Sequence, residues 1–283
     1  MESIGGLINN SRKIVIKIGS NVLSDDQGMV NKRIFHEIAE QTAELIKDGK
    51  QVVIVSSGAG ICGVGAINKW TRKDDINYKQ ALCAIGQVEL MMAYKEYFAD
   101  YDLHVAQILL TREDFSDRNR TLNIRNALFT LLDEGVVPII NENDSVSVDE
   151  IKIGDNDTLS AFTANLWNAD CLIVLSDING VYDKDPKRYD EAELIEEVWD
   201  IDGLLDEIDV RGKSDFGTGG ILTKIEAARR VNSYGIPMIL LNGKRSYIIR
   251  RAREGKEAGT EKAKKRGQFF LRNEEGPMKY GFI

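Results

Sequence analysis

The chain has 283 residues, of which 43% are hydrophobic and 29% are charged, with a formal charge of −8; these values are ordinary for a globular protein with room for a large core. No segment approaches the ~18 consecutive apolar residues of a membrane span, and the first residues lack the basic-then-apolar layout of a signal peptide, so we expect a cytoplasmic protein with no membrane partner. Two His and three widely spaced Cys residues disfavour a His-based triad, a zinc site and a disulfide framework.

Short β-branched segments alternate with amphipathic helical patterns along most of the chain. The predicted strands are 13–18, 51–55, 104–110, 136–140, 171–175 and 238–241. The predicted helices are 31–48, 78–100, 120–134, 158–168, a segment ending near 234, and a short basic helix within 246–256. We expect 204–211 to be a surface excursion. Strand, helix and strand in this order predict parallel pairs joined by right-handed crossovers, and therefore one α/β domain.

Polar clusters follow four of the predicted strands directly. They are 17–20, 57–60, 141–144 and 176–177. Each cluster alone is equally typical of a turn rich in Asn, Asp and Gly, and Asp157 by itself stands where the N-cap of a helix belongs. In open α/β sheets, however, the carboxyl ends of the strands line the ligand crevice, so four clusters at that edge favour a binding site there.

Two glycine-rich segments are candidates for anion binding. Small residues fill 57–65, and three glycines in 217–220 precede a helix that carries Lys224. Backbone N–H groups at such helix starts can bind a phosphate, although close helix packing explains 57–65 equally well. Neither segment matches the phosphate loop Gly-x-x-x-x-Gly-Lys-Ser/Thr or a full Gly-x-Gly-x-x-Gly.

These polar groups fit phosphoryl transfer better than nucleophilic catalysis. Lys17 and Lys224 supply positive charge, whereas no His or Cys is placed to act as a nucleophile or its base. Phosphoryl transfer depends mainly on positioning and on charge stabilisation. A carboxylate acceptor would need no general base, because it is already ionised at pH 7.

The same residues resemble those of the amino acid kinase superfamily, in the family's order over about residues 13–243. The matching segments are 15–20, 55–59, 110–112, 117–118, 141–144, 152–157, 175–177, 180–182 and 217–224. The most specific are Asn-Glu-Asn-Asp at 141–144 and Gly-Asp-Asn-Asp at 154–157. The resemblance implies a three-layer αβα sandwich around a central, mostly parallel sheet. It also implies that ATP, with Mg²⁺, phosphorylates the side-chain carboxylate of L-glutamate to glutamyl 5-phosphate, the first step of proline biosynthesis.

The resemblance also implies roles for individual residues. Lys17 and Lys224 would neutralise the transferred phosphoryl group, and Asp157 would hold both ammonium groups in place. The residues implied to bind glutamate are Ser57, Asp144 and Asn156. Those implied to bind ATP are Lys17, Ser176, Asp177, Thr218, Gly219, Gly220, Ile221, Leu222, Thr223 and Lys224. No protein side chain is assigned to a metal.

Outside the site, we expect residues 1–258 to form the kinase domain and 259–283 to be a tail that does not form the RNA-binding-like (PUA) domain of many relatives. By analogy we expect a homo-oligomer, a dimer or tetramer. Eleven Lys and Arg against three Asp and Glu make 244–272 basic, which we interpret as a solvated helix face or subunit contact in preference to a nucleic-acid site. The alternatives are a sister kinase acting on acetylglutamate or aspartate, and a non-catalytic nucleotide-binding protein of the same fold.

Overall fold

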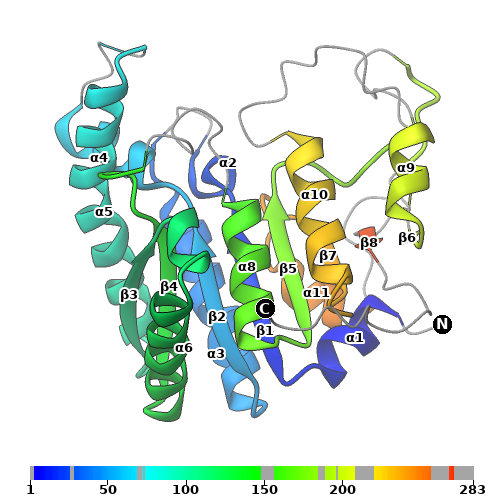
Figure 1. The fold of residues 1–283 in the computed structure, drawn as a ribbon, viewed down its shortest axis with the longest axis horizontal. Coiled ribbons are helices and arrows are strands. Elements are labelled where there is room, and N and C mark those ends of the chain that lie inside the picture. The colour runs from blue at the N-terminus through cyan, green and yellow to red at the C-terminus, as the bar shows by residue number, and fades with distance from the viewer. Residues whose placement is uncertain are drawn as a thin grey trace.

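An eight-stranded sheet in the order β3-β4-β2-β1-β5-β7-β8-β6 runs through the middle of the computed structural model (Figure 1). The residues that the structure describes are 3–25, 29–68, 72, 74–147, 156–183, 189–195, 197–207, 220–255 and 268–270. The strands are β1 (Lys13–Ile18), β2 (Gln51–Ser56), β3 (His104–Leu110), β4 (Val136–Glu142), β5 (Cys171–Ser176), β6 (Glu197–Val198), β7 (Met238–Asn242) and β8 (Gln268–Phe270). The pairings from β3 across to β7 are parallel, and β8 runs antiparallel to β7. The prediction of a mostly parallel sheet is confirmed.

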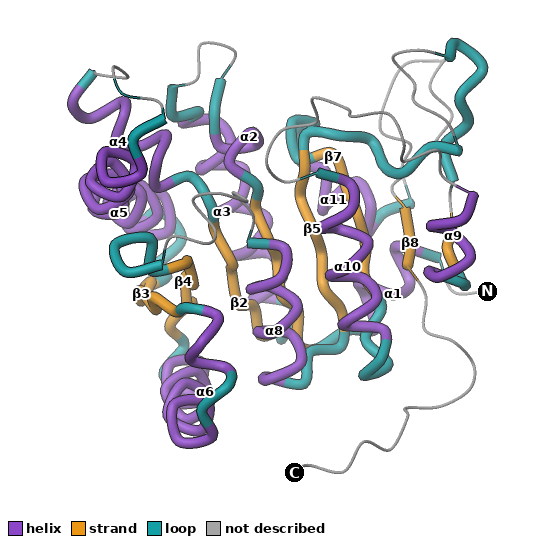
Figure 2. The backbone as a smooth tube through the Cα atoms, turned by 45° about the horizontal axis from the view of Figure 1, so that its top comes forward, coloured by secondary structure: helices purple, strands orange, loops and turns teal. Residues whose placement is uncertain are grey.

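Helices cover both faces of this sheet, which makes three layers (Figure 2). One face carries α1 (Ile4–Asn10), α3 (Lys32–Lys47), α4 (Ala59–Ile67), α5 (Ile76–Ala99) and α11 (Ile248–Arg253). The other carries α6 (Arg118–Asp133), α8 (Asp157–Trp167), α9 (Ile201–Glu207) and α10 (Ile221–Asn232). The short helix α2 (Ser20–Leu23) and the 3₁₀ helix η1 (Arg112–Phe115) follow β1 and β3. Because each face of the central strands is buried under a separate apolar core, the expected αβα sandwich is confirmed.

The connections from the two central strands diverge. The chain leaves β1 toward the face that carries α3, and the connection from β5 to β7 contains α9 and α10 on the opposite face. Since β1 and β5 are neighbours in the sheet, a crevice is expected between their carboxyl ends, which lie at the top in Figure 1. The fold therefore predicts a ligand site beside Lys17, near the end of β1.

Several short elements, such as α2, η1, β6 and β8, were not expected from the sequence, and three further differences concern the site or the core. Strand β4 continues two residues past its predicted end and includes Asn141 and Glu142, which are 2% and 3% exposed. The predicted surface excursion at 204–211 is wrong for its first part, because Leu204 belongs to α9 and is buried in the core under α10, while 208–211 lie outside the described residues. The helix α1 was not expected; Ser3 caps it and Ile4 and Ile8 pack into the α3 side of the core.

Glycines allow α4 and α5 to pack in direct backbone contact. A Cβ added at Gly63 would lie 1.9 Å from the carbonyl oxygen of Leu82, and one at Gly86 would lie 1.8 Å from that of Ala59. Both distances are far below any real contact, so neither position accepts a side chain without separating the helices. The small residues of 57–65 are therefore explained in part by helix packing, the alternative already considered.

Two arginines of α11 pair with acidic residues of the chain. Arg250 pairs with Glu40 and Glu44 of α3, and Arg253 pairs with Asp48 at the end of that helix. These pairs fasten α11 to the outer surface of α3, which favours a structural role for this part of the basic region. In the part of the chain with described coordinates, none of the helices combines the length and apolarity needed to cross a bilayer.

Candidate active site

Lys17 reaches the site because of the pleat of β1. Ile14, Ile16 and Ile18 point into the core under α3, so Val15 and Lys17 point to the opposite face, where α8 and α10 lie. Lys17 is 3% exposed, and its Nζ lies 2.5 Å from Oδ1 of Asp157. A buried ammonium group is costly without an anionic partner, and the carboxylate supplies one.

Asp157 opens α8 and is fully buried. The N-cap is Asn156, one residue earlier, and its side chain makes no capping hydrogen bond. The N-cap alternative for Asp157 is therefore wrong, because its carboxylate is used in tertiary contacts. Its Oδ2 lies 3.0 Å from Nζ of Lys224 and accepts a hydrogen bond of 3.1 Å from the Thr223 hydroxyl.

Lys224 belongs to the first turn and a half of α10, which packs beside α8 (Figure 1). Its side chain is 4% exposed, the same as that of Lys17. The structure thus brings together two lysines separated by more than 200 positions, one on each oxygen of the same carboxylate. Together the three groups carry one net positive formal charge at neutral pH, an arrangement suited to an anion.

Two of the three residues expected to bind the acceptor, Ser57 and Asn156, lie close together because of a hydrogen bond to the backbone. Asn156 donates through Nδ2 to the carbonyl oxygen of Ser56 at 2.9 Å, which places it beside the buried Ser57. Ser57 in turn follows β2 and donates its backbone N–H to the carbonyl oxygen of Ile18 at 3.0 Å. The ends of β1 and β2 and the start of α8 therefore meet at one point of the sheet edge.

Asp144 lies on the turn that follows β4, against α5. Its carbonyl oxygen accepts a hydrogen bond of 3.2 Å from Gln80 Nε2, and its carboxyl group contacts the thiol of Cys83. Burial raises the pKa of Asp144 to about 6, and the hydrogen bond with Cys83 opposes that rise. A carboxylate that is poorly solvated in this way would gain from pairing with a cation.

Asn141 was missed as a separate contributor, although it was part of the Asn-Glu-Asn-Asp motif. Its Oδ1 accepts from Asn156 Nδ2 at 2.7 Å, and its Nδ2 donates to Gln87 Oε1 on α5 at 2.7 Å. The motif was the signal that could have found Asn141. Gln87 lies within an ordinary helical pattern, and nothing in the sequence marks it.

The residues expected to bind ATP lie on the other side of the lysine pair. Ser176 ends β5, and Asp177 accepts a hydrogen bond of 2.9 Å from Asn21 Nδ2 in α2, which joins the loop after β5 to the loop after β1. Gly220 is the N-cap of α10 and offers no side chain to its first-turn N–H groups, which are then available to a phosphate. The residues Ile221, Leu222 and Thr223 form that first turn. Thr218 and Gly219 lie outside the described residues.

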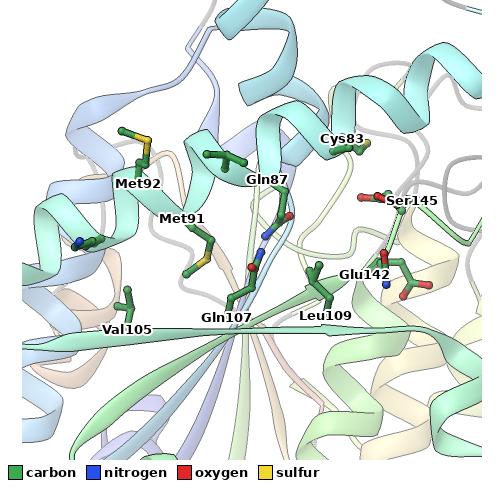
Figure 3. Close-up of a pocket in the computed structure, with 14 residues that line it drawn as sticks. Cys83, Gln87, Met91, Met92, Val105, Gln107, Leu109, Glu142 and Ser145 are labelled. Carbon is green, nitrogen blue, oxygen red and sulfur yellow. The ribbon is translucent and has the colours of Figure 1, made fainter.

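A cavity of about 470 Å³ opens between α5 and β3, next to the turn that carries Asp144 (Figure 3). Its lining includes Cys83, Gln87, Met91, Met92, Leu109 and Asp144. Gln87 and Gln107 point toward each other across it in Figure 3. Lys17, Asp157 and Lys224 do not line this cavity, so it is a different place from the one where the two lysines meet.

The arrangement can stabilise negative charge but offers little for covalent catalysis. Burial raises the pKa of Cys62 and of Cys171 to about 12, so neither thiol is a nucleophile near pH 7. In the described part of the chain, no group of three or more His, Cys, Asp or Glu side chains is placed to hold a metal ion. What the site does provide is two ammonium groups on one carboxylate beside the N-terminus of α10, groups suited to phosphoryl transfer.

Comparison with known proteins gives a consistent result. The sequence profile of the amino acid kinase family matches residues 12–242. The chain is 63% identical over 254 residues to a protein of Alkaliphilus metalliredigens named glutamate 5-kinase, covering 90% of this chain and 96% of that protein. It is 62% identical over 243 residues to the glutamate 5-kinase of Alkaliphilus oremlandii, covering 86% and 92%. The solved structure of UMP kinase from Ureaplasma parvum covers 92% of this chain and 98% of its own, with a TM-score of 0.61 at 17% identity, which supports the fold alone.

Proposed function

The chain belongs to the amino acid kinase family, and from that premise we propose that it transfers the γ-phosphoryl group of ATP to the side-chain carboxylate of L-glutamate, yielding glutamyl 5-phosphate. Two relatives above 60% identity that bear the name glutamate 5-kinase support this choice of substrates. The name of these relatives implies that the reaction is the first step of proline biosynthesis. We place it in the cytoplasm, where both substrates occur.

The observation that carries the proposal is the pair of buried lysines on Asp157. In phosphoryl transfer, negative charge spreads over the equatorial oxygens of the moving group, and catalysis consists largely of neutralising that charge in a fixed geometry. Lys17 and Lys224 supply the charge, and Asp157 and Thr223 restrict where the ammonium groups can lie. A protein that only stored or sensed nucleotides would gain nothing from charge that is best matched to the transition state.

Ser57, Asn156 and Asp144 would hold glutamate with its side-chain carboxylate toward the lysines. An α-ammonium group has only donors, so it requires acceptors such as the carboxylate of Asp144 and the amide oxygen of Asn156. The raised pKa of Asp144 fits this role, since a bound ammonium would supply the stabilisation that burial removes. The acceptor carboxylate itself is ionised at pH 7 and needs no general base.

ATP would lie between the loop after β5 and the start of α10, with its phosphates near the α10 N-terminus. Ser176, Asp177 and the segment 218–224 would bind it. Mg²⁺ suits this site as a partner of the nucleotide, because it is commonly held by phosphates and water with few carboxylates, and no side-chain cage is found among the described residues. When bound, it would neutralise part of the phosphate charge.

The test is an ADP-release assay with purified protein, ATP and Mg²⁺, in which glutamate, N-acetylglutamate and aspartate are compared as acceptors. We expect turnover with glutamate that exceeds the other two by at least about tenfold in kcat/KM. Preference for N-acetylglutamate or aspartate would favour a sister kinase. ATP binding without turnover on any of the three would favour the non-catalytic alternative.

We also propose that the protein is a homo-oligomer, a dimer or tetramer. Large apolar side chains are exposed side by side on α5, where Val88 is 60% and Met92 is 59% exposed, and Leu109 on β3 lies across the same cavity. Apolar surface of this kind commonly marks a protein contact. Sedimentation of the wild type and of Val88→Glu tests this: a shift of the variant to monomer is expected, and a wild type that sediments as a monomer would refute it.

A further inference from the structure

The amide group of Asn156 has its orientation fixed by a backbone atom. Its Nδ2 donates to the carbonyl oxygen of Ser56 at 2.9 Å and to Oδ1 of Asn141 at 2.7 Å. The carbonyl of Ser56 can only accept, so a rotated amide would place two oxygen atoms against each other there. With Nδ2 engaged twice, the remaining polar atom of Asn156 is Oδ1, an acceptor.

Asn141 is oriented in the same way by the opposite kind of backbone group. Its Oδ1 accepts from the backbone N–H of Glu142 at 2.9 Å, a group that can only donate. The nitrogen of Asn141 must then point away, and it donates to Oε1 of Gln87 at 2.7 Å. Gln87 is therefore the last member of the chain of amides and determines the orientation of neither asparagine. Both asparagines are buried, at 2% and 4% exposure, which makes an unpaired rearrangement costly.

We infer that Asn141 is a positioning residue for the acceptor substrate, because together with the Ser56 carbonyl it holds Asn156 with its amide oxygen toward the ammonium group of glutamate. This inference rests on the proposed function. Asn141 would not touch the substrate; it would act through Asn156. The two anchoring backbone groups belong to β2 and β4, which are paired strands, so the sheet itself sets the position of that oxygen.

This arrangement also bears on substrate choice. An oxygen acceptor facing the α-nitrogen favours a free ammonium group, which is charged and carries three donors, over an acetylated nitrogen, which is neutral and carries one. An amide held by the Ser56 carbonyl alone would be fixed less firmly and would discriminate less. Asn141 is thus expected to contribute to the preference for glutamate over N-acetylglutamate.

The test compares three variants. Asn141→Leu keeps the approximate volume but removes one of the two acceptors for Asn156 Nδ2 and leaves the Ser56 carbonyl as the other. Asn141→Asp keeps an oxygen for Asn156 and for the N–H of Glu142, and Gln87 can turn its amide to donate to the second oxygen. Gln87→Ala is the matched control, since it removes a hydrogen bond from the same Asn141 without altering the orientation of either asparagine. Glutamate and ATP kinetics and the melting temperature are measured for each.

We expect Asn141→Leu to raise the KM for glutamate at least about tenfold, with the KM for ATP within about twofold of wild type; tenfold corresponds to about 1.4 kcal/mol. Asn141→Asp and Gln87→Ala should both stay within about threefold. An unchanged glutamate KM in Asn141→Leu, or an equal rise in Gln87→Ala or Asn141→Asp, would overturn the inference. A wild type with no glutamate-dependent turnover would instead refute the proposed function.

Discussion

Replacing Asp157 by Asn tests the charge arrangement at its centre. The carboxylate is fully buried between two ammonium groups whose side chains are each 4% exposed. Asparagine has nearly the same shape, so the substitution removes charge with little change in packing. It leaves Lys17 and Lys224 as like charges in one buried site. Removing one partner of a buried ion pair commonly costs about 3–5 kcal/mol, because the remaining charge is uncompensated.

That cost can be followed by thermal unfolding. For a chain of this size, 1 kcal/mol corresponds to about 2–4 °C in the melting temperature, so we expect Asp157→Asn to melt about 6–20 °C below wild type. Activity should fall by about 10³-fold or more, by analogy with the loss of other charge-positioning groups in phosphoryl transfer. Differential scanning fluorimetry and ADP release measure the two effects on the same preparation.

Two further variants separate charge from packing. Lys224→Met alone leaves Lys17 paired with Asp157, so it should lower activity severely while lowering the melting temperature less than Asp157→Asn does. The double variant Asp157→Asn/Lys224→Met removes one of the two like charges, and it should melt above Asp157→Asn although it is no more active. If Asp157→Asn is as stable as wild type, or if the destabilisations in the double variant simply add, the electrostatic reasoning is wrong.

Three other expectations follow from the described geometry. Burial raises the pKa of Asp144 to about 6 from an ordinary value of 3.8, so the folded chain binds this proton more tightly than the unfolded chain. The stability contributed by the neutral carboxyl group therefore falls as the pH rises from about 4 to about 6. Denaturation curves should show this pH dependence in the wild type and its loss in Asp144→Asn. Gly86→Ala should destabilise the chain by at least about 1–3 kcal/mol, whereas Gly60→Ala on the facing helix meets only Cys83 Sγ at 3.6 Å and should change the melting temperature by no more than a degree or two. Arg250→Met should lower stability by about 1 kcal/mol through loss of its pairs with α3, with both substrate KM values unchanged; a changed KM would mean that α11 affects the site.

Much of the fold was predictable because the central strands are buried on both faces. A continuous β-branched run bounded by polar residues and glycine predicted β1 with its observed bounds, Lys13–Ile18. The bounds of β3, His104–Leu110, were also predicted, although this strand lies at the edge of the sheet and is partly exposed. The end of β4 was predicted two residues too early, because its last two residues are polar. Asn141 and Glu142 look like loop residues by composition, yet Asn141 is buried through hydrogen bonds to Asn156 and Gln87, partners that lie far away in the sequence.

The candidate site was predictable as a location but not as a set of contacts. Strand order placed the polar clusters at one edge of the sheet, and this argument needed no relatives. That Asp157 joins Lys17 to Lys224 came from resemblance, because spacing alone does not say which side chains meet across 140 or 67 positions. The pairing of Asn21 with Asp177 and the contact of Gln87 with Asn141 had no local signal at all.

The register of β1 determines both the packing of the fold and the position of Lys17. In a strand, successive side chains point to opposite faces, so a slip of one residue would move Lys17 from the α8 side into the apolar core under α3. Such a slip would also turn Ile16 and Ile18 toward α8, so it would disrupt both apolar cores as well as misplace the lysine. β1 is held in place from both sides, since it pairs with β2 through six positions and with β5 through five. The position of the Lys17 ammonium group is therefore set by the same isoleucine and valine residues that made the strand recognisable in the sequence.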